Sequence, residues 1–495
     1  MIWVSTLKKE AAMSGNIRIG KGMAAFQNTA VNQKEILVKS SFVQVIQNRD
    51  RAVIWHSLFG NPQIVSNEVV ELFDFFSRSN SLSSLTDEYD INEDGQRVIR
   101  GLIATCYLIP VNFDERGILS ARMKDREAEV ISGSQVDYLG LIMAEVCNFA
   151  CVYCIHFSNL GTSDRVNSPQ KIMAFETAKD AIDGYLSILR QHGKKTANIN
   201  FGGGEPLLAW LIIERLLRYC QTEYGSEFEF KFSINTNASL ITPAIAKRLK
   251  EHGVKVSSSL DGLREGNDLV RQTQSGRGTF DEITRGFDCL AEHGYPLDGI
   301  AVTINERNLP FLNEAIIDWA AAHHMGEVRI DIDVVGIIDI SIDKIATRLM
   351  MVKRHAKKYG IEIAGFWSRP VENLNNSALI SHVAFCGGAR GNSLCVSPAG
   401  GIYSCGYSNI QIGSLDKMAS LHEVGGEYHH FVLGHLTGNI EMCRGCAIEG
   451  QCNGGCNITH EFAGVNKTAK VERMCSFYRR MTTELLLEQL KDVGS

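Results

Sequence analysis

Three features that would place this chain in common functional classes are missing from its 495 residues. It has no run of about 18 apolar residues, the length needed to cross a membrane. The stretch MIWVSTLKKEAAMSG at the start has an apolar core too short for a secretory signal peptide. Lys and Arg number 50 against 56 Asp and Glu, so no basic surface is available for nonspecific nucleic-acid binding. We therefore expect a cytoplasmic protein that binds neither membranes nor nucleic acid.

The sequence pattern predicts three domains, at residues 1–135, 136–375 and 376–495. The first has no cysteine cluster, and its short apolar runs precede segments with helical spacing, which favours a small α+β, winged-helix-like unit. From residue 136 strands alternate with helices, which predicts an α/β fold with a parallel sheet and right-handed crossovers. The last domain is rich in cysteine.

Each expected strand of the middle domain has one polar face. The expected strands lie at 137–143, 197–201, 229–235, 255–260, 300–305 and 328–335. Ordinary parallel strands are buried on both sides and read as continuous apolar runs. A polar face repeated over several strands instead predicts a partial (β/α)6 barrel with a polar lumen. The alternative is that these polar residues lie at strand ends and meet solvent.

The 14 cysteines are unevenly distributed, and in a reducing compartment they favour metal or redox chemistry over disulfides. Cys147, Cys151 and Cys154 follow the first barrel strand, where such folds place their chemistry. Three thiolates cannot complete a four-iron cluster, which needs four ligands, so one iron would stay open to a small molecule. A zinc site completed by His156 is the alternative.

The C-x3-C-x-aromatic-C spacing, with Tyr153 as the aromatic residue, and the run FGGGEP at 201–206 resemble the radical S-adenosylmethionine (SAM) superfamily. The resemblance implies that a 4Fe-4S cluster on the three cysteines binds SAM, and that a 5'-deoxyadenosyl radical abstracts hydrogen from the substrate. It also implies that Gly203, Gly204 and Glu205 hold the methionine amino group. Glycine suits that role because its backbone can come close to a ligand.

The same resemblance extends to further residues of the SAM pocket. Ser233 and Asn235 share a strand face, as ribose-binding residues of the family do, although polar filling of the lumen would look the same. Arg271 matches a position that commonly pairs with the SAM carboxylate, and Thr303 lies on the polar face of its strand. Asp331 and Asp333 are the candidate catalytic residues, but the sequence identifies no general base.

Eight cysteines lie between Cys386 and Cys475, and their spacing resembles the SPASM subgroup of that superfamily. The subgroup's pattern implies two auxiliary 4Fe-4S clusters, giving three clusters in all, and Cys395 supplies the eighth ligand. The expected partition is Cys386, Cys395, Cys405 and Cys456 at one site, and Cys443, Cys446, Cys452 and Cys475 at the other. A zinc ribbon is the alternative for the C-x2-C pair alone. Cys106, Cys220 and Cys289 are expected to be buried small hydrophobes.

The resemblance implies an enzyme that modifies a peptide or protein side chain and takes electrons from a donor such as flavodoxin or ferredoxin. The first domain then looks like a peptide-recognition element to which a precursor's leader adds a strand. We expect a peptide maturase that forms a thioether or carbon-carbon crosslink. A maturase for an anaerobic sulfatase or a quinohemoprotein amine dehydrogenase is the alternative, although Gly406 follows Cys405 where sulfatase maturases usually have Asp. An iron-sulfur electron-transfer or scaffold protein is the alternative outside enzymes.

Overall fold

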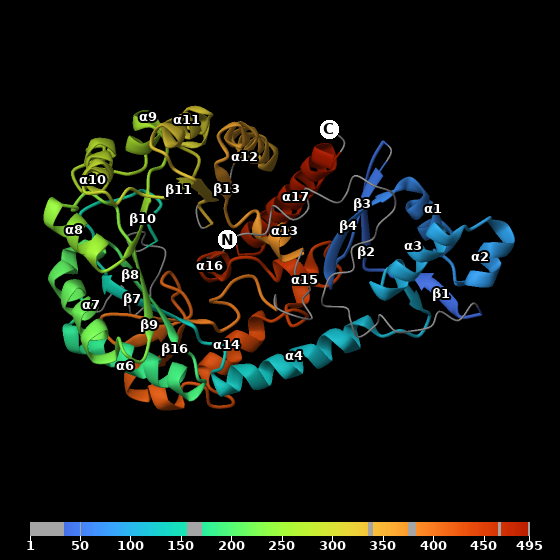
Figure 1. Ribbon diagram of the computed structural model, residues 1–495, viewed down its shortest axis with the longest axis horizontal. Helices are drawn as coiled ribbons and strands as arrows, with labels where there is room; N and C mark the ends of the chain where they lie inside the picture. Colours follow the sequence, from blue (N-terminus) through green and yellow to red (C-terminus); the bar gives the residue numbers. More distant parts are fainter. Residues whose placement is uncertain are drawn as a thin grey trace.

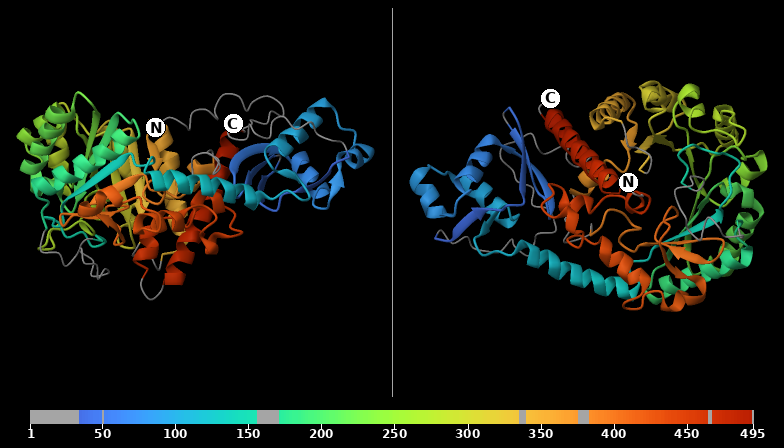
Figure 2. Two further views of the ribbon diagram at one scale, coloured as in Figure 1. Left: turned by 90° about the horizontal axis from the view of Figure 1, so that it is seen from below. Right: turned by 180° about the vertical axis from the view of Figure 1, so that it is seen from behind.

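The computed structural model describes residues 34–49, 51–155, 171–334, 340–374, 383–463 and 467–493. Figure 1 shows a curved sheet with helices on its outer side at one end of the molecule and the N-terminal unit at the other. The C-terminal elements lie between these two parts, and one long helix, α4, runs alongside them, as the views from below and behind in Figure 2 also show.

One ten-stranded sheet forms the larger part, in the order β13-β12-β11-β10-β9-β8-β7-β14-β15-β16. Strands β7 to β12 pair in parallel in chain order. Within the described residues the sheet has two open ends, at β13 and β16, so the predicted α/β fold with a partial barrel is confirmed. The strands are β7 (Tyr138–Ala144), β8 (Thr196–Gly203), β9 (Glu229–Asn235), β10 (Lys255–Ser259), β11 (Gly299–Ile304), β12 (Glu327–Ile332), β13 (Glu362–Ala364), β14 (Ser393–Val396), β15 (Gly401–Tyr403) and β16 (Gln411–Ser414).

Amphipathic helices cover the outer face of the barrel strands. In α10, Ile283, Phe287 and Leu290 recur at helical spacing and are buried against the sheet side. Helix α8 begins at Pro243, directly after a Thr242 hydroxyl that accepts the Ile245 amide N–H. The helices are α6 (Phe175–Gln191), α7 (Trp210–Tyr224), α8 (Pro243–Glu251), α9 (Arg264–Asp268), α10 (Phe280–Glu292), α11 (Ala315–Ala322) and α12 (Ile342–Ala356).

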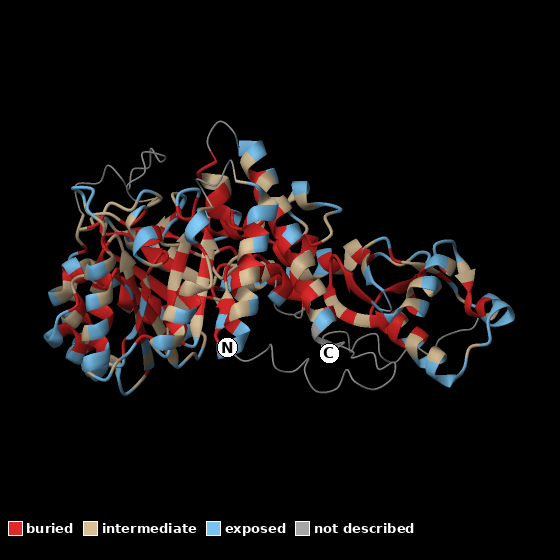
Figure 3. Cartoon of the chain, turned by 90° about the horizontal axis from the view of Figure 1, so that it is seen from above, coloured by how far each residue is buried: buried red, intermediate tan, exposed pale blue. Residues whose placement is uncertain are grey.

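The barrel strands alternate in burial as predicted. In β11, Ile300, Val302 and Ile304 are buried while Thr303 between them is half-buried. Strand β9 shows the same alternation, with Ser233 half-buried and Asn235 exposed. Figure 3 shows buried residues along the sheet and exposed ones on the outer sides of the helices. Half-buried or exposed polar residues therefore alternate with buried apolar ones along these strands, as the sequence pattern predicts.

The cysteine-rich region begins by extending the barrel sheet, which the sequence pattern did not predict. Strand β14 runs parallel to β7, and β15 and β16 continue antiparallel beyond it. Cys395 on β14 lies so close to Gly140 that a Cβ there would come within 2.7 Å of its Sγ. The remaining elements are α13 (Arg369–Leu374), α14 (Glu427–His435), α15 (Glu449–Cys452), α16 (Asn457–Glu461) and α17 (Lys467–Val493). The predicted boundary at 375/376 lies outside the described residues.

The N-terminal unit contains two three-stranded antiparallel sheets, β5-β1-β6 and β2-β3-β4. Its strands are β1 (Ile36–Lys39), β2 (Val43–Asn48), β3 (Arg51–His56), β4 (Gly60–Ser66), β5 (Asn80–Ser81) and β6 (Leu108–Pro110). Its helices are α1 (Asn67–Phe75), α2 (Leu82–Glu88), α3 (Glu93–Ala104) and α4 (Glu115–Ser132). Within the described ranges, no helix of the chain is both long and apolar enough to cross a membrane.

Strand β3 belongs to two cores at once. Ala52 and Ile54 pack in the core of the N-terminal unit, whereas Val53 and Trp55 on the opposite face pack in the main core. The two parts therefore share a strand rather than meet at a simple linker.

The contact between the two parts continues onto the loop between Cys446 and Cys452. Trp55 Nε1 donates to the Ala447 carbonyl at 2.8 Å, and the Gly450 N–H donates to the Ser57 carbonyl at 2.8 Å. Arg116 of α4 forms a bidentate ion pair with Glu449, at 2.9 and 3.1 Å. The N-terminal unit thus holds the loop between two of the predicted cluster ligands.

The isolated cysteines divide into two kinds. Cys106 and Cys220 are buried, as expected. Cys289 is only half-buried, so the expectation of full burial was wrong for this residue, because it lies toward the outer side of α10 rather than on its sheet-facing side.

Candidate active site

The loop that carries Cys147, Cys151 and Cys154 leaves β7 at the carboxyl edge of the parallel strands. Two of its main-chain amides donate hydrogen bonds to the segment 270–272. The Ala150 N–H donates to the Gln272 carbonyl at 2.6 Å, and the Val152 N–H donates to the Val270 carbonyl at 2.9 Å. That segment includes Arg271. The loop is therefore held against the residue that the sequence pattern predicted for the same site.

The thiols of this loop lie close to one another, since that of Cys154 contributes to the raised pKa of both Cys147 and Cys151. Burial is the main cause for two of them, raising the pKa of Cys147 to about 11 and that of Cys151 to about 12, while Arg271 opposes the shift at Cys151. Cys147 Sγ also faces N–H donors, the Phe149 amide at 3.4 Å and Asn237 Nδ2 at 3.6 Å. Such donors stabilise a sulfur that carries negative charge.

The glycines at the end of β8 allow a close backbone contact with the start of the cysteine loop. A Cβ at Gly203, where φ is +120°, would lie 2.2 Å from the Ala144 carbonyl oxygen, and a Cβ at Gly204 would lie 2.3 Å from that of Val146. The Gly204 N–H donates to the Ala144 carbonyl at 2.7 Å. The sequence argument expected glycine here for approach to a ligand, and the structure adds a packing reason within the chain itself.

Glu205 is fully buried and accepts three hydrogen bonds. The donors are the Leu207 N–H at 3.0 Å, the Thr236 hydroxyl at 2.7 Å and the Asn237 N–H at 2.8 Å. Burial nevertheless raises the pKa of Glu205 to about 7. Because Asn237 also contacts Cys147, it connects the carboxylate of Glu205 to the cysteine loop. Nothing in the sequence indicates a role for Thr236, because its role is the hydrogen bond to Glu205, which forms only in the folded chain.

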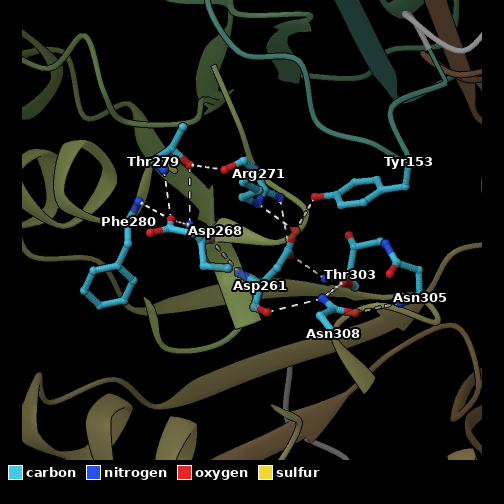
Figure 4. A network of polar contacts seen from close by, with 10 residues as sticks. Tyr153, Asp261, Asp268, Arg271, Thr279, Phe280, Thr303, Asn305 and Asn308 are labelled. Carbon is cyan, nitrogen blue, oxygen red and sulfur yellow. Dashed lines mark hydrogen bonds and ion pairs between the residues drawn. The ribbon is translucent and has the colours of Figure 1, made fainter. Parts of the chain in front are cut away.

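Asp261 brings together three of the predicted residues, as Figure 4 shows. Arg271 Nε donates to its carboxylate at 2.8 Å, the Thr303 amide donates at 2.7 Å, and the Tyr153 hydroxyl also donates to it. Asn308 Nδ2 reaches its main-chain carbonyl at 3.3 Å. Asp261 was missing from the predicted site, although its place just after β10, at the carboxyl edge of the sheet, is a usable signal.

A family profile described as the radical SAM superfamily matches residues 141–309. The chain carries a radical SAM domain. It is 23% identical over 465 residues to the radical SAM cyclopropyl synthase TigE of Paramaledivibacter caminithermalis, covering 92% of this chain and 97% of TigE.

Sulfatase maturases are also related to this chain. It is 24% identical over 356 residues to a serine-type anaerobic sulfatase-maturating enzyme of Klebsiella aerogenes, covering 69% of this chain and 82% of that protein. The solved structure of native anSMEcpe with bound AdoMet superimposes with a TM-score of 0.58 at 18% identity, covering 73% of this chain and 100% of that one. That likeness is one of fold.

The radical SAM family implies SAM and one 4Fe-4S cluster, and the residues around the cysteine loop fit both. Among the described residues, no three His, Cys, Asp or Glu side chains gather tightly enough to hold a single metal ion. A cluster spreads its thiolates more widely, because irons and sulfides lie between them. His156, the fourth ligand of the zinc alternative, lies outside the described residues.

The other predicted residues of the radical SAM domain lie on β9 and at the end of β12. The Ser233 hydroxyl accepts from Asn200 Nδ2 at 2.8 Å, and Asn235 is exposed. Asp331 pairs with Arg329 at 2.6 Å, and the Asp333 amide donates to the Ile304 carbonyl at 2.8 Å. Arg271 is engaged by Asp261, and its role toward the SAM carboxylate stays a prediction.

The C-terminal cysteines fall into two groups. In the first group, burial and the thiols of Cys386 and Cys405 contribute to the raised pKa of Cys456. The second group consists of Cys443, Cys446, Cys452 and Cys475. Burial and the thiols of Cys446 and Cys475 contribute to the raised pKa of Cys443 and of Cys452, and the thiol of Cys446 contributes to that of Cys475. Cys395 lies on β14 beside β7. The partition of the eight cysteines between two sites stays a prediction.

Proposed function

We propose that this chain is a radical SAM maturase that modifies a peptide or protein side chain by forming a carbon-carbon bond. The observation that carries the proposal is the likeness to TigE over 92% of the chain, which must include most of residues 1–135. TigE is a cyclopropyl synthase by name, and closing a cyclopropyl ring makes a carbon-carbon bond. The thioether crosslink stays a prediction from the sequence.

Cys147, Cys151 and Cys154 would hold the 4Fe-4S cluster of the radical SAM domain. The residues proposed to hold SAM are Tyr153, Gly203, Gly204, Glu205, Ser233, Asn235, Arg271 and Thr303. Together, SAM and the reduced cluster supply a 5'-deoxyadenosyl radical that abstracts hydrogen from the substrate.

The chain's own residues orient and shield this centre. Asp261 fixes the Arg271 guanidinium beside Cys151, where its charge favours a negatively charged sulfur. Asn237 donates toward Cys147 while its amide holds Glu205. Phe149, which is 1% exposed, closes the loop against the barrel and keeps water from its inner side. These contacts set the position and charge of the site before any substrate binds.

We place two auxiliary 4Fe-4S clusters at the C-terminal cysteine groups. Their donors are thiols only, which suits iron-sulfur clusters. An external donor such as flavodoxin or ferredoxin would supply the electrons. The open three-cysteine loop and the GGGEP run at 202–206 separate the chain from a simple electron carrier, which needs neither an open iron nor an amino-acid pocket.

We assign peptide recognition to the N-terminal unit. Within the described residues its sheet β2-β3-β4 leaves β2 and β4 as outer strands. A precursor's leader could add to such an edge through main-chain hydrogen bonds. The contacts of Trp55, Ser57 and Arg116 with the loop between Cys446 and Cys452 connect this unit to the cysteine-rich region.

The sulfatase-maturase alternative has less support. The alignment with the Klebsiella aerogenes enzyme covers 69% of this chain, compared with 92% for TigE. Gly406 and Tyr407 follow Cys405, so the Asp usual in sulfatase maturases is missing from that position. A maturase directed at another protein would also form 5'-deoxyadenosine in the test below, so the product has to distinguish the two.

The test combines anaerobically reconstituted enzyme, SAM and dithionite with peptides encoded by the neighbouring reading frames. We expect 5'-deoxyadenosine and a peptide product that has lost two hydrogen atoms, located by tandem mass spectrometry. Asp281→Asn serves as a matched surface control, and the triple Cys147→Ala, Cys151→Ala, Cys154→Ala variant serves as the inactive one. A product with an aldehyde in place of a Ser or Cys side chain would show a sulfatase-type reaction and contradict the carbon-carbon bond.

A further inference from the structure

A buried tyrosine hydroxyl without a partner lies in the cysteine-rich region. Tyr478 of α17 is 1% exposed, and its hydroxyl oxygen has no hydrogen-bond partner in the described part of the chain. Its ring packs against Phe385, with centroids 5.4 Å apart, so the side chain is held in place. Buried polar atoms nearly always have a partner, and an orphan usually marks a ligand or water that belongs there.

The Tyr478 ring lies against the segment that ends at Cys456. Burial raises the pKa of Tyr478 well above its ordinary value. The thiols of Cys456 and Cys452 and the carboxylate of Asp331 add to that shift, while Arg369 opposes it. These two cysteines belong to different groups. A Cβ at Gly455 would lie 2.7 Å from Tyr478 Cε2, so the segment between them presses directly on the ring.

Helix α17 presents other residues to the same region. Tyr478 and Arg479 lie on either side of the face of α17 that carries Cys475, because they are three and four residues from it. Arg479 Nη1 approaches Cys446 Sγ at 3.9 Å, so this face already directs one N–H donor at a cysteine sulfur. Thiolate and sulfide sulfurs accept hydrogen bonds but donate none, so an O–H donor suits them.

We propose that the Tyr478 hydroxyl donates a hydrogen bond to a sulfur of the auxiliary cluster held by the Cys456 group. This hydrogen bond raises the reduction potential of that cluster. The direction follows because reduction makes the cluster more negative, and a hydrogen bond to its sulfur stabilises that state more. This inference rests on the auxiliary clusters of the proposed function.

Tyr478→Phe in the reconstituted holoenzyme tests the proposal, because it removes the hydroxyl and keeps the ring. Redox titration followed by electron paramagnetic resonance reports the potential of each cluster, and chemical analysis reports iron. We expect unchanged iron and a lower potential for one auxiliary cluster only, by enough to change its ratio of reduced to oxidised form several-fold at a fixed potential. The SAM-binding cluster should keep its potential.

Tyr428→Phe is the matched control. Tyr428 is also 1% exposed, but its hydroxyl donates to the Gly391 carbonyl at 2.7 Å. This control should lower Tm and leave every potential unchanged. Tyr478→Phe should instead lower the potential of one auxiliary cluster.

Each outcome decides the matter. Unchanged potentials in a fully loaded Tyr478→Phe enzyme would overturn the proposal and assign the hydroxyl to a buried water. Loss of the iron of one auxiliary cluster from that variant alone would support it, because the ring is retained. About 4 rather than about 12 irons in the unsubstituted enzyme would overturn the auxiliary clusters and the Tyr478 proposal together.

Discussion

Removing the charge of Asp261 should disturb the active site more than any surface substitution of the same kind. Asp261 and Arg271 form an ion pair with side chains 0% and 9% exposed. Asp261→Asn leaves the buried guanidinium without its counter-charge, and breaking one side of such a pair costs about 3–5 kcal/mol. For a domain of this size we expect Tm to fall on the order of 10 °C.

The effect should also reach the cysteine loop. Tyr153 donates to Asp261 from within the loop, and Thr303 donates from β11, so the substitution weakens both anchors. We expect weaker SAM binding and partial loss of the iron held by Cys147, Cys151 and Cys154. Thermal unfolding, iron analysis and equilibrium SAM binding measure the three effects on one preparation.

Asp281→Asn is the matched control for Asp261→Asn. Asp281 forms the same kind of bidentate pair with Arg264, but the two side chains are 73% and 54% exposed. Exposed pairs of this kind contribute little to stability, so Tm, iron and SAM affinity should stay near those of the unsubstituted protein. If the two variants unfold at the same temperature and bind iron and SAM equally, the buried network has no role in holding the site.

Two further predictions follow from single residues. Gly450→Ala places a Cβ 1.9 Å from the Leu58 carbonyl oxygen, so we expect a loss of about 1–3 kcal/mol and of the iron held by Cys446 and Cys452, with SAM cleavage retained. Gly434→Ala, which meets nothing within 4 Å, is its control, and equal iron in both would contradict the docking contact. Burial raises the pKa of Glu205 from its ordinary value of 4.5 to about 7. Protonated Glu205 therefore contributes to the free energy of unfolding of the SAM-free protein. This contribution is complete below pH 4.5 and is lost as pH rises through 7. Glu205→Gln should remove that loss, on the order of 3 kcal/mol, from urea midpoints compared at pH 5 and pH 8.

The barrel could be predicted because its signal is local. Alternation along β9, β11 and β12 depends on neighbouring residues, and the cysteine loop and the FGGGEP run depend on short spacing. Strand β14 escaped prediction because its four residues pair with β7, some 250 residues away in the chain. Helix α4 was not predicted, because its buried face includes the charged residues Glu115 and Arg126. Their polar partners come from distant segments of the chain.

The predicted site was incomplete for the same reason. Tyr153, Arg271 and Thr303 come from separate parts of the sequence, and only the folded chain shows that Asp261 joins them. The boundary near residue 135 marks a change of pattern, yet β3 packs into cores on both sides of it. Point variants such as Gly450→Ala are therefore better tests of the N-terminal unit than its deletion, which would expose apolar surface of the main core.

Reductive cleavage of SAM is the most direct test of the central claim. Anaerobically reconstituted protein, supplied with SAM and dithionite, should release 5'-deoxyadenosine without any peptide. The triple alanine variant of Cys147, Cys151 and Cys154 should lose this activity completely, along with about a third of the iron. An iron-loaded protein that releases no 5'-deoxyadenosine, or a triple variant that still does, would contradict the account.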